Sequence, residues 1–123
     1  MRARTILLGL AMGALAANSM DAGELMTIRV SPAVCFAPAN LVVQARILSH
    51  AENRSIQIVA ESDDFYRSSE LQLDGDRAPR TTRFEFRSLP PGTYEVKATL
   101  RDESGHERAA VRQQVNVITT GAR

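Results

Sequence analysis

The sequence has few of the cysteine and histidine residues that form disulfides or bind metals in small domains. It contains one cysteine, Cys35, no tryptophan and two histidines in 123 residues. A single cysteine excludes an intramolecular disulfide, so the hydrophobic core must hold the fold alone. His50 and His106 stand far apart in turn-like sequence and give no metal-ligand spacing. We therefore expect no metal and no other cofactor.

The motifs of common catalytic sites are missing as well. The sequence has no Gly-rich phosphate loop ahead of a helix, no H-E-x-x-H and no G-x-S-x-G. No potential nucleophile has a base that the sequence places beside it. We therefore expect a protein that is not an enzyme.

Long hydrophobic runs are also absent. The longest apolar run covers residues 5–17, behind Arg2 and Arg4. Its roughly 13 residues fall short of the about 20 that span a bilayer as a helix. Basic residues, a short apolar run and then small residues follow one another as in a secretory signal. We therefore expect an exported protein, periplasmic or extracellular, with no membrane span after cleavage.

This N-terminal pattern divides the chain. Cleavage near Ala16 or Ala17 leaves enough residues for one domain and too few for two. The expected parts are a signal peptide at 1–16, a flexible segment at 17–25, the domain at 26–118 and a C-terminal tail at 119–123.

The net charge of the exported part is close to zero. Without Arg2 and Arg4, 13 basic side chains stand against 14 acidic ones, for a formal charge of −1. Such a weak charge argues against nucleic acid or an anionic membrane as the partner.

Apolar and polar residues alternate with period two along most of the chain from Met26 to Ile118. This alternation is typical of half-buried strands. Turn signals recur about every 8–12 residues, as in sandwich folds. The sequence therefore predicts an all-β antiparallel sandwich of about seven strands. The predicted apolar faces include Leu41, Val43, Ala45 and Ile47; Ile56, Ile58 and Ala60; Leu71 and Leu73; Phe84 and Phe86; Tyr94, Val96, Ala98 and Leu100; and Val111, Gln113, Val115 and Val117.

Two prolines interrupt the beginning of this pattern. Pro32 ends the first strand, and Pro38 ends the short apolar piece around Cys35. Because proline removes a ladder donor, the chain could switch from one sheet to the other here. Cys35 would then be either a small buried residue or an unpaired thiol that links the chain to a partner or a second copy.

The turn Leu89-Pro90-Pro91-Gly92-Thr93-Tyr94 resembles the corner before the sixth strand of immunoglobulin-like and fibronectin type III-like sandwiches. The resemblance covers Met26 to Ile118 and is to bacterial exported domains of this kind. It implies that the Tyr94 hydroxyl bonds to the backbone a few residues upstream. Pro90 and Pro91 would stop the preceding strand, and Gly92 would allow a sharp turn. The chain departs from true immunoglobulin domains because it lacks the tryptophan and the cysteine pair.

The most unusual segment holds two adjacent aromatic residues among charged ones. Phe65 and Tyr66 lie between Asp63-Asp64 and Arg67, in what reads as a connection after the strand that ends near Glu61. Adjacent strand residues face opposite ways, so at least one ring is expected outside the core. An exposed aromatic beside Asp and Arg fits contact with a protein, or with the face of a sugar. The alternative is that one ring packs on the core edge and the other covers a loop.

Two functions follow from these features. The first is an exported noncatalytic binding or accessory module of the cell envelope, with Asp63, Asp64, Phe65, Tyr66 and Arg67 as candidate contact residues. The second is a structural or assembly protein joined to other copies or to an envelope complex through an edge strand or Cys35. The sequon Asn53-Arg54-Ser55 is expected in an accessible turn.

Overall fold

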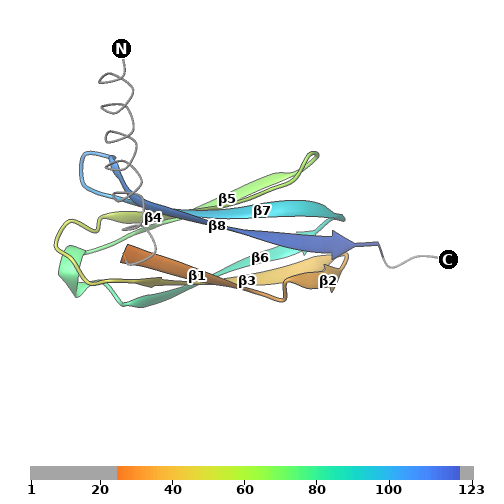
Figure 1. Cartoon of the computed structure of the whole chain (residues 1–123), viewed down its shortest axis with the longest axis horizontal. Coiled ribbons are helices and arrows are strands. Elements are labelled where there is room, and N and C mark those ends of the chain that lie inside the picture. The colour runs from red at the N-terminus through yellow and green to blue at the C-terminus, as the bar shows by residue number, and fades with distance from the viewer. Residues whose placement is uncertain (1–24, 120–123) are drawn as a thin grey trace, which may run out of the picture.

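The computed structural model describes residues 25–119, and the expected signal peptide lies outside them. Eight strands form two sheets that pack face to face (Figure 1). Within this range, no helix is long and apolar enough to cross a membrane. The elements are β1 (Met26–Ser31), β2 (Val34–Phe36), β3 (Ala39–Ile47), β4 (Ser55–Glu61), β5 (Tyr66–Gln72), the 3₁₀ turn η1 (Gly75–Arg77), β6 (Thr81–Leu89), β7 (Gly92–Arg101) and β8 (Glu107–Ile118).

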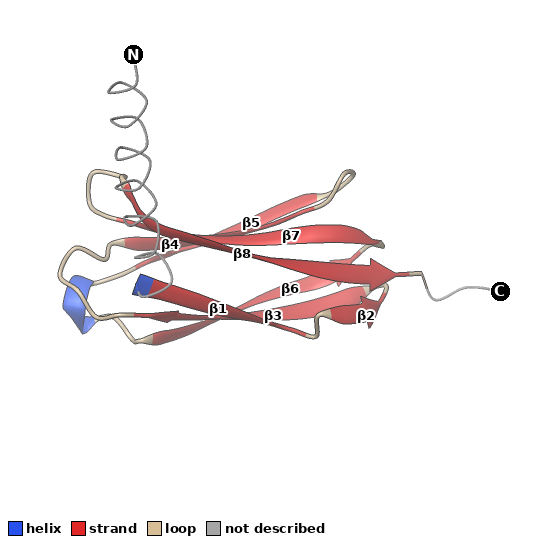
Figure 2. Ribbon diagram, in the orientation of Figure 1, coloured by secondary structure: helices blue, strands red, loops and turns tan. Residues whose placement is uncertain are grey.

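The two sheets differ in width. The smaller has the order β1-β3-β6 and the larger the order β2-β8-β7-β4-β5. Neighbouring strands are antiparallel, except that β2 runs parallel to β8. Figure 2 shows that strands are the main elements of the described chain and that loops and short turns join them. The all-β sandwich is therefore confirmed, with eight strands in place of about seven.

The eighth strand results from the predicted switch between sheets. β1 pairs with β3 in the smaller sheet, and β2 pairs with β8 in the larger one. Pro32 lies between the two strands, where no ladder hydrogen bond needs its missing N–H. The chain can therefore leave one sheet and join the other.

The core lies between the sheets, and the alternating residues fill it. The predicted inward faces of β3, β4, β6 and β7 are buried throughout. On β8, Val115 and Val117 are buried, while Val111 and Gln113 are partly exposed. Opposite charges pair across the last hairpin, since Arg112 Nε lies 3.6 Å from Glu95 Oε2.

Strand β5 departs from the prediction. It begins at Tyr66, where the sequence suggested a connection, and all seven of its residues are exposed. Leu73, just beyond it, is buried, but Leu71 is 37% exposed. The smaller sheet has three strands to cover five, so the last strand of the larger sheet overhangs it. The period-two pattern cannot reveal such an overhang.

The sequon prediction is wrong, because Asn53 is completely buried. Its Nδ2 donates to the carbonyl oxygen of Leu48 at 2.9 Å, and its Oδ1 accepts a hydrogen bond from Arg108. The Gly75 N–H donates to the Asn53 carbonyl at 3.0 Å. Gly75 has φ +57°, and a Cβ there would lie 2.8 Å from the Ala51 carbonyl oxygen. The turn therefore closes over the Asn53 side chain, which no glycosylating enzyme could reach in the folded protein.

Replacing Asn53 by alanine tests this interpretation. Asn53→Ala leaves the Leu48 carbonyl and the Arg108 guanidinium without their partner, so the free energy of unfolding should fall by about 2 kcal/mol. Glu52→Ala, at the exposed neighbouring position, is the control and should change it little. Urea denaturation followed by circular dichroism measures both. Equal stability of the two variants would show that the buried amide contributes nothing.

Candidate functional site

Tyr94 anchors the end of the sandwich where the candidate residues lie. Its side chain is fully buried, and its hydroxyl donates a 2.7 Å hydrogen bond to the Pro90 carbonyl, four residues upstream. This is the corner geometry that the resemblance implied. Burial raises the pKa of the Tyr94 hydroxyl, although a hydrogen bond with Ser62 and the charge of Arg67 act in the opposite direction. The hydroxyl therefore stays protonated and can donate.

Gly92 lets the β4–β5 loop approach this corner. Its φ is +156°, and a Cβ on it would lie 3.3 Å from the Cβ of Ser62. That spacing is tighter than most contacts of real Cβ atoms, so a larger residue would push the loop outward. The loop that carries Asp63 and Asp64 is thus seated directly on the turn before β7.

Phe65 and Arg67 extend the anchoring from the corner to β6. The Phe65 ring meets the Tyr94 ring edge-on, with centroids 6.2 Å apart and planes at 76°. The Arg67 guanidinium lies 5.1 Å from the Phe65 centroid, and its Nη1 donates to the Arg87 carbonyl at 2.9 Å. These two residues support the loop from its inner side.

The other three candidate residues face solvent. Asp63 and Asp64 are exposed, and Tyr66 keeps 58% of its surface exposed. Tyr66 lies opposite Glu61 in the β4–β5 ladder, on the outer face of the larger sheet. The structure therefore divides the five candidates into an anchoring pair, Phe65 and Arg67, and an exposed set that a partner could reach.

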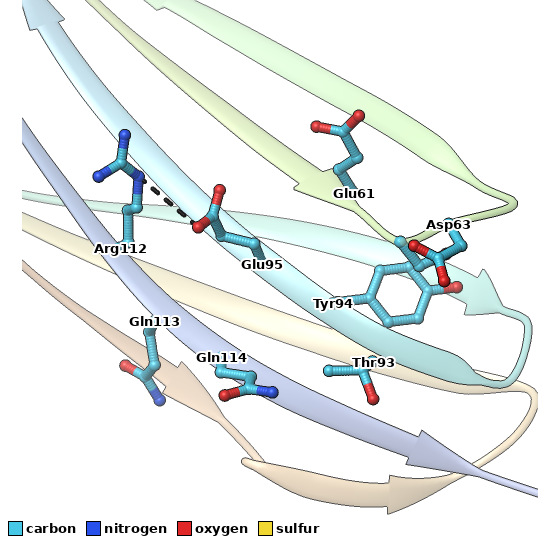
Figure 3. A pocket seen from close by; sticks show the side chains of 9 residues that line it. Glu61, Asp63, Thr93, Tyr94, Glu95, Arg112, Gln113 and Gln114 are labelled. Atoms are coloured by element: carbon cyan, nitrogen blue, oxygen red, sulfur yellow. Dashed lines mark ion pairs between the residues drawn. The ribbon is translucent and has the colours of Figure 1, made fainter.

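A shallow, open pocket of about 570 Å³ lies on the same outer face, and Figure 3 shows its lining. Asp63, Glu61 and Glu95 bring three carboxyl groups to it, and Arg112 brings one guanidinium. Only one of these carboxylates, that of Glu95, is paired with the arginine. The lining therefore carries an excess of negative charge.

The strand register places two of these carboxylates side by side. Glu61 on β4 is directly opposite Glu95 on β7. Like charges in directly opposite positions destabilise a sheet. Sequence reasoning missed this pair, because 34 positions separate the residues and only the pairing of β4 with β7 brings them together. The sequence showed only that both positions are polar and so face outward, not that they lie opposite each other.

Cys35 lies at the far edge of the larger sheet. Its side chain is partly buried and packs against the core, and burial raises the pKa of its thiol. Its neighbours Val34 and Phe36 are 59% and 61% exposed. Contact with the core supports packing better than a linking role, and the raised pKa of the thiol, which disfavours the reactive thiolate, agrees with it.

Within residues 25–119, no three His, Cys, Asp or Glu side chains are grouped so that they could hold a metal ion. The three pocket carboxylates point different ways rather than at a common centre, as Figure 3 shows for Glu61 and Asp63.

Comparison with solved structures shows the fold. A superoxide reductase (neelaredoxin) from Ignicoccus hospitalis superposes with a TM-score of 0.56 at 12% identity, over 76% of this chain and 80% of that one. The PKD domain of an M14-like peptidase from a Thermoplasmatales archaeon gives 0.53 at 14% identity, over 76% and 93%. CopC from Methylosinus trichosporium gives 0.51 at 19% identity, over 80% and 97%.

These likenesses show that the chain has an immunoglobulin-like β-sandwich fold. Identities below 20% indicate the fold and carry no activity over. No protein family model matches the chain, and no curated protein sequence is similar to it.

Removing the corner hydroxyl tests the anchoring role of Tyr94. Tyr94→Phe keeps the ring and loses the bond to Pro90, so we expect the free energy of unfolding to fall by about 1 kcal/mol or somewhat more. Tyr66→Phe removes the exposed hydroxyl instead and should leave stability unchanged. Urea denaturation compares the two variants. A Tyr94→Phe protein as stable as the original would contradict a structural role for the corner bond.

Neutralising Glu61 tests the repulsion across β4 and β7. Glu61→Gln removes one of the two opposed charges, so the melting temperature at low salt should rise slightly and the gain should shrink as salt screens the charges. Glu70→Gln, on the outer face of β5 but opposite Gln57, is the matched control. If the melting temperature rises equally for both variants, or if the rise does not depend on salt, Glu61 and Glu95 do not repel each other measurably.

Proposed function

We propose that this chain is an exported, noncatalytic binding module of the cell envelope, and that its partner is a protein. The contact surface is the outer face of the larger sheet at the end where β4, β5 and β7 meet. The small sandwich fold agrees with such a module. The observation that carries the proposal is the exposed Tyr66 ring beside an acidic pocket.

Tyr66 suits contact because its ring is exposed while the backbone on both sides of it is held in place. Its neighbours on both sides, Phe65 and Arg67, are held against Tyr94 and β6. Because its backbone is held on both sides, Tyr66 has only side-chain freedom to lose on binding, and tyrosine is enriched in protein interfaces. The ring can therefore contribute apolar contact at low entropic cost.

The charge beside Tyr66 favours a partner that presents a basic group. The carboxylates of Glu61 and Asp63 have no ion pair within the described chain, and Glu61 also opposes Glu95. A lysine or arginine side chain placed between Glu61 and Glu95 would relieve their repulsion. A basic segment of a protein matches this need, whereas a neutral sugar does not.

Capture from the native envelope tests the proposal. The wild-type domain and two exposed-residue variants, Tyr66→Ser and Leu48→Ser, would serve as bait after their folding has been matched by circular dichroism. Leu48 is 56% exposed and lies at the opposite end of the sandwich, so it is the matched control. We expect one protein partner to be captured by the wild type and Leu48→Ser and lost with Tyr66→Ser.

Salt and Glu95 give a second readout. Capture should weaken as ionic strength rises, and Glu95→Gln should weaken it further, because both reduce the attraction to a basic group. The proposal fails if Tyr66→Ser captures the same protein as strongly as the wild type, or if no partner binds under low salt.

A further inference from the structure

The sandwich has four edge strands, and three of them are blocked against pairing with another chain. β1 lies alongside β8, so its edge faces the other sheet. β2 is three residues long and has Pro32 and Pro38 on either side. Short length and flanking proline are two ways in which proteins protect a sheet edge.

β6 is protected by charge and by side chains that bond to its backbone. Its outward positions carry Arg83, Glu85 and Arg87. The Arg87 carbonyl accepts a hydrogen bond from the side chain of Arg67. The Ser88 N–H donates to Asn40 Oδ1 of the neighbouring β3 at 3.0 Å, at the irregular end of the β3–β6 ladder. Ser88 has φ +59°, which distorts the strand where its register with β3 shifts between Ala39 and Leu41.

β5 has none of these protections beyond one charge of each sign. Its seven residues pair with β4 in an unbroken register and include no proline and no bulge. Hydrogen bonds join Ser62 to Phe65 and Arg54 to Leu73 at the two ends of the ladder. Because bonded pairs alternate along an antiparallel ladder, every second residue of β5 turns its N–H and C=O away from β4. These residues are Tyr66, Ser68, Glu70 and Gln72.

These outward groups make a continuous template for another strand. They amount to four N–H donors and four C=O acceptors, and within residues 25–119 no other hydrogen bond reaches them. An unpaired edge of this kind favours pairing with an extended segment. The occupant must match a seven-residue strand that carries one arginine and one glutamate.

We propose that the occupant is a second copy of this chain, whose β5 pairs antiparallel with the first about a two-fold axis at Ser69. In that register Ser68 faces Glu70 of the second copy, and Tyr66 faces Gln72 of the second copy. All eight outward backbone groups of each strand then find partners. No like charges are opposed, and Ser68 can donate to the carboxylate opposite it.

The two neighbouring registers, in which the axis passes through Glu70 or Ser68, are less favourable. An axis at Glu70 would oppose the two glutamates, and an axis at Ser68 would leave the Gln72 groups unpaired. With the axis at Ser69, the exposed Leu71 lies opposite Arg67 of the second copy, whose aliphatic stem can cover it. The dimer would join two larger sheets into one continuous outer face that carries two Tyr66 surfaces.

Sedimentation equilibrium tests the dimer, with protein purified after expression of the full chain and kept under reductant so that Cys35 cannot cross-link copies. From micromolar to millimolar concentration, we expect the wild type to pass from monomer to dimer. Ser68→Pro removes an N–H that points outward and so leaves the bonds to β4 intact. It should raise the dissociation constant of the dimer by about tenfold or more. Ser68→Thr keeps the N–H and should dimerise as the wild type does.

Cysteine cross-linking tests the register and does not depend on the proline variant folding. In a Cys35→Ser background, Ser69→Cys places two thiols directly opposite each other at the axis, close enough for a disulfide. Ser68→Cys is equally exposed but faces Glu70 of the second copy, so it should cross-link several-fold less. A monomer at all concentrations, or stronger cross-linking by Ser68→Cys, would overturn the proposal. The proposal does not rest on the envelope partner, since capture and self-association are measured separately.

Discussion

The hydrogen bond from the Tyr94 hydroxyl to the Pro90 carbonyl holds together the end of the molecule on which the rest of the site is built. It closes the connection from β6 to β7, where the chain passes from the smaller sheet to the larger one. A domain with one cysteine has no disulfide to tie its sheets, so packing and this corner must do so. The β4–β5 loop then rests on the corner through Ser62 and Phe65.

The unequal width of the sheets explains why the loop and β5 are exposed. Three strands face five, and the residues of β5 therefore lie outside the core although they continue a regular ladder from β4. An overhanging strand leaves both a face and an edge free. The face carries Tyr66 beside the acidic pocket, and the edge carries unpaired backbone groups. One feature of the architecture thus supports both proposals.

The two proposals use different chemistry on neighbouring surfaces. Partner binding would draw on the exposed Tyr66 ring and on the charge excess around Glu61 and Glu95. Side-chain variants can change both, and salt screens the charges. Self-pairing would draw on backbone hydrogen bonds, which depend on register and are insensitive to most side chains. A dimer would bring two partner surfaces onto one continuous face, so a modest affinity at each could act jointly.

The sequence by itself determined the features that depend on neighbours along the chain. Period-two alternation predicted the strands and most of the buried faces, the Pro-Pro-Gly-x-Tyr turn predicted the corner, and Pro32 marked the switch between sheets. Only the tertiary structure decided three features. Asn53 is buried, Phe65 packs on Tyr94 while Tyr66 is exposed, and Glu61 lies directly opposite Glu95. The physical reason is that each of these depends on which strands become neighbours and how far one sheet covers the other. A local pattern reports which side of a strand is apolar, but not what lies opposite it.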